Sequence, residues 1–578
     1  GGDFSMTKIR NYFIIFASVF AISSACALVG VQDVKAQEGP ALADLIKRIE
    51  SLESRPGSNV TAGKGKIKGL NIGLHIRHRY EIRNQMIMDT AAFGLGGVTR
   101  GGGGNDGRTN RAATTLTGLT GTKPNTNLGR NETQDFTLQW VHMNFDFNVN
   151  RNVRAYVELQ DARTFGVDST TVGNRGSRTS AQEAYVELRN LENVSSVLKN
   201  VELRIGRWRA AYGNQRLIGA LPWANQTRGY DGARLRWASD SKKHWVDAFA
   251  WQINEKETGV ASGDSPSDDT DEVLYGIYSH FKVADGNVFE PYFLARARSA
   301  EDTQGAGVVV GAATGGAGSS GEQRYTLGFR LDGRNIGALP GLDYTVEPAW
   351  QFGTVEGFRT VGRLVDFDPA TGTAAAGTST GSNTNQSNRI QAFAIYAGTG
   401  YTFKNLPWTP RIGYALSYAS GDKRADSGSA KTFDHLYPTG HGHNGYMDLT
   451  AWQNIVDHQI HLSFKPTKKL VVDAKLHLFD MDEEADHLYN VGGGIGYGGP
   501  GGVNRTGSDT YTDLNGEIRD VDDELGQELD ITVKYKFLKN FGVTAGYSHF
   551  FAGDWIEDTG GGVDRGVDWA YLMTSVKF

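Results

Sequence analysis

The sequence has one cysteine, Cys26, and after residue 31 it has no apolar run long enough to cross a bilayer as a helix. Because Cys26 lies in the N-terminal apolar stretch, the exported chain would have neither a disulfide nor a thiol nucleophile. Apolar residues are only 39% of the 578 residues, and the formal net charge is -6. This charge gives none of the basic excess that a nucleic-acid partner requires. The sequence therefore predicts no nucleic-acid partner and no helical membrane domain downstream of the N-terminus.

The N-terminal segment has the features of an export signal. Lys8 and Arg10 precede the uncharged stretch NYFIIFASVFAISSACALVGV, and small residues around Ala36 offer a cleavage site. We expect residues 1–36 to be a signal peptide with a short upstream extension. An uncleaved anchor helix and lipidation at Cys26 are the alternatives.

Strand-like alternation dominates the remainder of the chain, which is rich in glycine (75 residues) and in aromatic residues (11%). In GLNIGLHIRHRYEIR, for example, Ile72, Leu74 and Ile76 share one face, and Arg77 and Arg79 share the other. About eighteen segments show this period of two, an even number suited to a closed antiparallel barrel whose alternate residues face lipid and water. The last of them ends on an aromatic residue, Phe578, as outer-membrane strands usually do.

The expected connections alternate between short turns and long polar links. The predicted long links are 84–133, 162–180, 300–321, 354–388, 421–453, 482–524 and 552–566. Open sheet edges inside a bilayer would leave backbone groups unsatisfied, so the strands must close into a ring. We predict an all-β fold, one closed antiparallel transmembrane barrel over residues 66–578, with 84–133 and 354–388 as candidates to enter the channel.

A short heptad seam precedes the predicted barrel, in residues 37–58. Its apolar positions, spaced three, four and three residues apart, are Leu42, Leu45, Ile49 and Leu52. The spacing predicts a short N-terminal helix that could form a homotrimer, although two heptads alone are marginal. The alternative is a single helix lying against the mouth of the barrel.

Two stretches, LRIGRWRAAYGNQRLIGALPWANQTRGYDGARLRW (203–237) and residues 417–479, closely resemble the alginate-export outer-membrane barrel family, and EPAWQFG (347–353) is a weaker match. The resemblance implies an eighteen-stranded barrel that passes an anionic uronate polymer outward. The heptad departs from this pattern and resembles the leader of trimeric anion-selective porins. The leading hypothesis is an outer-membrane channel for an anionic polysaccharide or small anions; a general or anion-selective trimeric porin, a barrel enzyme and a surface adhesion scaffold are the alternatives.

The polar register of the strands supplies the candidate channel-lining residues, in which cations outnumber carboxylates. They are Arg77, Arg79, Arg154, Arg189, Arg204, Arg234, Arg236, Arg296, Arg324, Arg330, Arg411, Lys475, Glu158 and Glu347. Guanidinium groups inside low-dielectric walls attract anions and set selectivity. The alternative is that these arginines pair with carboxylates across strands.

Two segments leave the facing of their side chains open. Around Gly206 both registers carry mixed residues, which suggests a bulge, and either face of KHWVDAFAWQI (243–253) could point outward. Six tryptophans near strand ends are expected in interfacial girdles or loop packing. They are Trp140, Trp237, Trp350, Trp452, Trp555 and Trp569.

The stretch YPTGHGHNGYMD (437–448) could supply a metal site from His441 and His443 with His435 or Asp448. Its spacing matches no standard zinc pattern, and its glycines indicate a turn-rich loop. We therefore predict no metal and no cofactor.

Ser548 with His549, or His477 with Asp473, could be offered as parts of a catalytic constellation. His549 shares a register with outward residues and is expected at the lipid rim. Adjacency in sequence is not the geometry of a triad, so we predict no catalytic residue.

Overall fold

The computed structural model describes residues 69–85, 132–165, 179–256, 270–298, 321–336, 339–356, 367–368, 373–374, 387–423, 429–484, 486, 488–493, 495–497, 510–512, 518–556 and 566–578. Residues 1–59 and 60–578 form separate units, and only the second contains described residues. The expected signal peptide (1–36) and heptad helix (37–58) therefore lie outside the described part. No helix among the described residues is long and apolar enough to span a bilayer.

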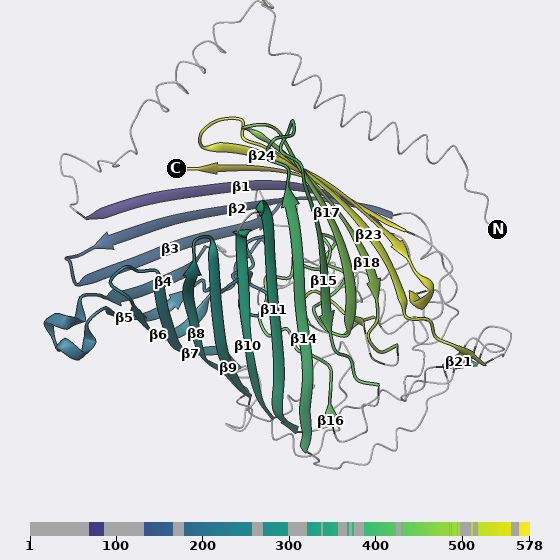
Figure 1. The fold of residues 1–578 in the computed structure, drawn as a ribbon, viewed down its shortest axis with the longest axis horizontal. Coiled ribbons are helices and arrows are strands. Elements are labelled where there is room, and N and C mark those ends of the chain that lie inside the picture. The colour runs from purple at the N-terminus through teal and green to yellow at the C-terminus, as the bar shows by residue number, and fades with distance from the viewer. Residues whose placement is uncertain are drawn as a thin grey trace, which may run out of the picture. The chain divides into compact units, whose positions relative to one another are not determined.

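Eighteen antiparallel strands of the main sheet close into a ring. The first strand, β1, pairs with β2 on one side and with the last strand, β25, on the other, from His75 opposite Lys577 to Asn84 opposite Asp568 (Figure 1). The strands of the ring are β1 (Leu70–Gln85), β2 (Glu132–Asn148), β3 (Val153–Thr164), β4 (Ser180–Leu188), β5 (Val201–Trp208), β6 (Tyr230–Ala238), β7 (His244–Lys256), β8 (Thr270–Ala284), β9 (Asn287–Arg298), β10 (Glu322–Ile336), β11 (Leu339–Glu356), β14 (Ser387–Thr402), β15 (Arg411–Ala419), β17 (Ile455–Thr467), β18 (Leu470–Asp480), β23 (Glu524–Tyr535), β24 (Phe541–Ala552) and β25 (Val567–Lys577). The predicted closed barrel is confirmed.

The remaining elements are short. They are the two 3-10 turns η1 (Leu191–Asn193) and η2 (Ser196–Leu198) and the strands β12 (Phe367–Asp368), β13 (Thr373–Ala374), β16 (Ser429–Ala430), β19 (Leu488–Tyr489), β20 (Ile495–Tyr497), β21 (Thr510–Thr512) and β22 (Ile518–Asp520). Of these strands, only β16 joins the main sheet, where it pairs in parallel with β14.

The alternation seen in the sequence separates the two faces of the wall. On β1, Tyr80 is 42% exposed on the outside, whereas Arg79 is 2% exposed and Glu81 1% exposed on the inside. Inward residues this deeply buried mean that the interior is filled by other parts of the chain. Outward apolar residues instead stay exposed, as a surface that meets lipid requires.

Short and long connections lie on opposite edges of the ring, as predicted. The short ones include 149–152, 239–243, 285–286 and 468–469. Two long connections, 209–229 and 257–269, were not among the predicted links. The first was missed because it contains leucine, isoleucine and aromatic residues, unlike a solvated polar loop. Ala210, Tyr212, Leu217 and Ile218 of this connection are buried.

The bulge predicted at Gly206 is wrong. The pairing of β5 with β4 and with β6 runs past this position without a shift of register. Gly206 and its partner Gly232 instead adopt φ values of 129° and 153°, which L side chains rarely adopt. The two glycines therefore give β5 and β6 an unusual backbone conformation without an inserted residue.

Gly206→Ala should therefore destabilise the barrel. A Cβ atom at this position would lie 2.2 Å from the carbonyl oxygen of Ala184, and the φ value adds strain of about 1–3 kcal/mol. Urea unfolding in phospholipid vesicles measures the loss of free energy. Gly542→Ala on β24 is the matched control, because its nearest contact would be at 3.9 Å. Equal stability of the two variants would contradict the requirement for glycine at position 206.

Candidate functional site: the lumen and its inner loops

Two long connections fold into the barrel and contact each other. We call residues 209–229, between β5 and β6, the first inner loop, and residues 429–454, between β15 and β17, the second inner loop. The backbone N–H of Tyr437 donates to Leu217 O (2.9 Å), that of Gly219 to Tyr437 O (2.8 Å), and that of Thr439 to Gln215 O (2.8 Å). The two loops therefore form one backbone-bonded unit within the lumen.

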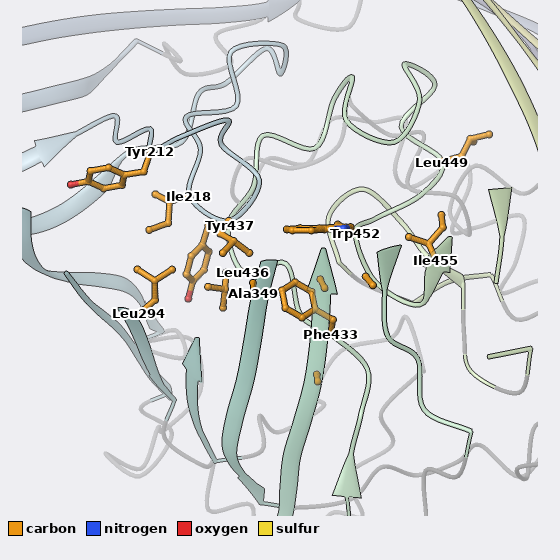
Figure 2. Packing of buried hydrophobic residues seen from close by; sticks show 14 of the residues in the cluster. Tyr212, Ile218, Leu294, Ala349, Phe433, Leu436, Tyr437, Leu449, Trp452 and Ile455 are labelled. Carbon is orange, nitrogen blue, oxygen red and sulfur yellow. The ribbon is translucent and has the colours of Figure 1, made fainter. Parts of the chain in front are cut away.

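Apolar side chains of both loops pack against the inner wall. Figure 2 shows Ile218 of the first loop and Tyr437 of the second near Leu294 of the wall; Phe433 and Trp452 of the second loop belong to the same buried cluster. Ile218 is 2% exposed and Phe433 0% exposed. Burial of these groups holds the loops in the channel through the hydrophobic effect.

The inward face of β7 is aromatic, which settles the ambiguity in 243–253. Phe249 and Trp251 are buried with their ring centroids 3.9 Å apart. Tyr212 of the first inner loop stacks on Tyr278 of β8 at 4.5 Å, and its hydroxyl donates to Asp247 (2.8 Å). This face therefore binds the loop, and the alanines between its aromatic residues point outward.

The arginines of β1 bind the first inner loop. Arg77 donates to the carbonyl oxygens of Pro222 (2.6 Å), Trp223 (3.0 Å) and Ala224 (3.0 Å). Arg79 donates to Trp223 O (2.6 Å), lies 3.8 Å above the Trp223 ring, and pairs with Glu81 at 2.7 Å. Both predicted lining residues thus hold a loop in place.

The second inner loop is bound from the other side of the ring. Arg296 of β9 contacts Asp434 and pairs with Glu322 at 2.7 Å. Arg324 of β10 lies 3.8 Å from Asp434 and 2.7 Å from Glu322. The Gln351 side chain donates to Asp434 O (2.6 Å) and accepts from its N–H (2.9 Å). Arg296 and Arg324, also predicted to line the channel, are anchoring residues here.

Carboxylates of β23 accept backbone N–H groups from YPTGHGHNGYMD. Glu528 accepts from Met447 (2.8 Å) and Asp530 from Tyr446 (3.2 Å). His441 lies 3.1 Å from Asp448 and stacks on Trp223, with ring centroids 4.0 Å apart. The stretch docks the second inner loop against the wall and against the first loop.

The histidines considered as metal ligands, His435, His441 and His443, do not converge on one point. Burial lowers the pKa of His435 to about 4, and burial followed by the nearby Arg216 lowers the pKa of His443, so both rings are neutral at pH 7. Among the described residues, no group of three or more histidine, cysteine or acidic side chains is arranged to hold a metal.

Most other predicted lining residues have partners on other strands, and Lys475 has one in the second inner loop. Their nearest contacts are Arg154–Asp146 (2.7 Å), Arg204–Glu187 (2.5 Å), Arg236–Asp247 (2.6 Å), Arg330–Glu290 (2.6 Å), Arg411–Asp343 (2.5 Å), Glu158–His142 (2.5 Å), Lys475 with Gly442 O (2.9 Å) and Glu347 with Tyr292 (3.4 Å). The inner wall also carries carboxylates that the sequence register missed, including Asp247, Glu290, Asp457 and Glu528. The cation excess expected along the whole lumen is therefore reduced by pairing.

One group of arginines keeps an excess of positive charge. We call Arg154, Arg189, Arg204, Arg234 and Arg236, contributed by β3 to β6 and the residue after β4, the arginine cluster. Glu187 lies at its centre, 2.5 Å from Arg204 and Arg189, 3.8 Å from Arg154 and 3.9 Å from Arg234. Among the described residues, Asp146, Glu202 and Asp247 are the other carboxylates that contact it, so five cations face four anions there.

The arginine cluster lies near the edge of the short connections, because β3 and β5 begin there and β4 and β6 end there. Arg189 is 34% exposed and Arg236 29% exposed, so a solute in the lumen can reach them. In outer-membrane barrels the short turns face the periplasm. All five arginines were predicted as lining residues; their grouping around one glutamate was not.

The side chains offered for catalysis do not form a triad. His549 pairs with Asp568 at 2.8 Å on the outer register of β24, whereas Ser548 points inward and donates to Asp530. Asp530 also stands 3.6 Å from His477, so a carboxylate separates the hydroxyl from the imidazole. Asp473 faces His461 instead, at 3.5 Å.

The six tryptophans expected in interfacial girdles or in loop packing are found in both kinds of position. Trp237 and Trp350 are exposed on the outside, where a girdle is expected. Trp140, Trp452, Trp555 and Trp569 are buried inside.

A closed antiparallel ring with a lipid-facing exterior and a charged, loop-filled lumen defines an outer-membrane β-barrel of the channel type. Residues 117–566, more than half of the chain, match the family model described as Alginate export, and the chain belongs to this family. Fold and family point to a transport channel of the outer membrane rather than to an enzyme.

Several solved structures from Pseudomonas aeruginosa are similar to this chain at low identity. OccD3 (OpdP) is 12% identical, with 91% of this chain and 95% of that chain covered and a TM-score of 0.45. OprD is 10% identical, with 89% and 95% covered and a TM-score of 0.45. Among curated proteins, none matches the chain. The barrel assignment therefore rests on the strand pairing and on the family.

Proposed function

We propose that the barrel is a passive channel for an anionic solute, and that this solute is an acidic polysaccharide moving outward. The arginine cluster is the observation that carries the proposal. Its five cations face four carboxylates at the edge where a solute from the periplasm enters. The description of the family, Alginate export, supports a carboxylate-bearing polymer.

The partial neutralisation of the cluster suits conduction better than a row of free cations would. A channel must attract its solute and also release it, which requires weak sites in series. Carboxylates at 2.5–3.9 Å from the arginines lower the affinity of each site for a passing anion. The exposed edges of the guanidinium groups still accept a carboxylate.

A small-anion porin is the second candidate, favoured by the inner loops, which fill part of the lumen. In that case the homotrimer expected from Leu42, Leu45, Ile49 and Leu52 would be the assembly, and it stays a prediction because these residues lie outside the described part. Outer-membrane lipid surrounds the barrel in both cases.

Conductance in planar lipid bilayers tests the proposal. The purified full-length protein should conduct ions without chemical turnover, with a reversal potential on the anion side in a salt gradient. Uronate oligomers should block the current more strongly than neutral oligosaccharides of equal length. A cation-selective channel would overturn the proposal, as would a barrel that does not conduct, which would favour an adhesion scaffold. A block by chloride-sized anions alone would favour the porin.

A further inference from the structure

Arg216 of the first inner loop is a buried cation without a neutralising partner. The residue is 4% exposed, and its Nε and Nη1 atoms have no hydrogen-bond partner. Among the described residues, no carboxylate oxygen lies within 4.0 Å of it, whereas Arg296 in the same lumen has three carboxylates within that distance. A guanidinium taken out of water without compensation is costly, so this arrangement requires a counter-charge.

Aromatic rings fix the plane of the Arg216 guanidinium. Its central carbon lies 3.7 Å above the Tyr396 ring of β14 and 5.4 Å from the ring of Trp452. Cation–π contacts of this kind stabilise the charge through the faces of the group. The guanidinium also donates to the Tyr396 hydroxyl, but its Nε and Nη1 groups have no acceptor.

Arg216 lines a pocket between the inner loops. The pocket is also lined by His435, Asn444, Thr450 and Trp452. The indole Nε1 of Trp452, which can only donate, is likewise buried without a partner. Because burial keeps the pKa of His435 near 4, that ring adds no competing positive charge at pH 7. Unsatisfied donors of the first and the second inner loop therefore meet at one pocket.

Charged groups of the surrounding wall do not complete the site. Glu347 of β11 and Asp457 of β17 attract Arg216 from beyond ion-pair distance, and Lys475 of β18 faces the same region. Asp457 is held by His477 (3.0 Å) and Gln459 (2.7 Å). Glu347 keeps one oxygen without a partner, so of these two carboxylates it is the one that could compete for Arg216.

We propose that the pocket between the inner loops binds a small anion, a halide or a single carboxylate group, on Arg216 and the Trp452 indole. The bound anion would neutralise Arg216 and join the two loops, since each loop contributes one donor. This inference deepens the proposed function and rests on it, because the anion reaches the pocket through the lumen.

Anomalous scattering from bromide tests the site in crystals of the full-length protein in detergent. A bromide peak is expected beside Arg216 and Trp452. It should be absent in Arg216→Gln and present in the control Arg389→Gln, an exposed arginine at the start of β14. Trp452→Phe keeps an aromatic ring but removes the N–H donor, and should weaken bromide binding about tenfold. This second variant tests the site if Arg216→Gln does not fold.

Crystals soaked in bromide together with acetate distinguish a halide site from a carboxylate site. Loss of the bromide peak in acetate identifies a carboxylate site, and its persistence identifies a halide site. No peak in the wild type, a peak retained in Arg216→Gln, or a direct Arg216–Glu347 ion pair would overturn the inference. Conductance of the same preparation shows which proposal has failed. A channel that conducts but binds no bromide would reject only the anion site in this pocket. A barrel that does not conduct would reject the proposed function.

Discussion

Glu187→Gln should raise the preference of the channel for anions, and Arg189→Gln should lower it. Glu187 is the shared partner of four arginines, so its neutralisation adds one positive charge to the arginine cluster without changing the shape of the side chain. Arg189 lies after the end of β4 and is one-third exposed, so its removal subtracts a charge at little cost to folding. A unit charge about 4 Å from the solute in water contributes about 1 kcal/mol, which is roughly a fivefold change in permeability ratio.

Reversal potentials in a salt gradient measure both changes. Arg207→Gln is the matched control, because Arg207 pairs with Asp231 on the outer face of β5, and its loss changes the net charge by the same amount outside the lumen. Shifts of the same sign in Glu187→Gln and Arg189→Gln, or a shift in the control as large as theirs, would refute the role of the arginine cluster.

Asp434→Ala should release the second inner loop and open the lumen. Asp434 is the only carboxylate of this loop that contacts Arg296 and Arg324 among the described residues. Removing one member of a buried ion pair costs about 3–5 kcal/mol, which raises the undocked fraction of the loop at least about 100-fold. We therefore expect larger and noisier single-channel currents.

Single-channel recording of Asp434→Ala beside Asp240→Ala tests this anchoring. Asp240 lies on an exposed turn between β6 and β7 and pairs with Lys199, so its loss should leave the current unchanged. If Asp434→Ala conducts as the wild type does while remaining folded, the loop is held mainly by its apolar packing around Phe433 and Ile218.

The barrel itself could be predicted from the sequence because each strand carries its own evidence. Ile72 and Arg77 on β1 belong to opposite registers, and a lipid surface and a wet or polar interior impose that difference residue by residue. The local backbone of the short strand β5 was not predicted correctly. Its mixed register around Gly206 suggested a bulge, whereas the strand pairs without a shift of register through two facing glycines with positive φ.

The inner loops could not be predicted, although the family resemblance lay on them. Residues 203–237 and 417–479 contain both inner loops, which are 200 or more positions apart in sequence and meet through Tyr437, Leu217 and Gly219. Nothing local in YPTGHGHNGYMD reveals that its N–H groups find Glu528 and Asp530. The density of apolar and aromatic residues in 209–229 was the available signal that this connection is not a solvated loop.

The sequence alone determined the class of this protein: alternating strands, no long apolar helix after the N-terminus, and closure forced by the cost of unsatisfied backbone groups in lipid. The tertiary structure decided which charges remain available to a solute. Arg77 and Arg296 share the inward register with Arg189. The first two bind the inner loops, whereas Arg189 pairs with Glu187 and keeps about a third of its side chain exposed. Register depends on neighbours along the chain, whereas neutralisation of a charge depends on distances of a few ångströms between groups that only folding brings together.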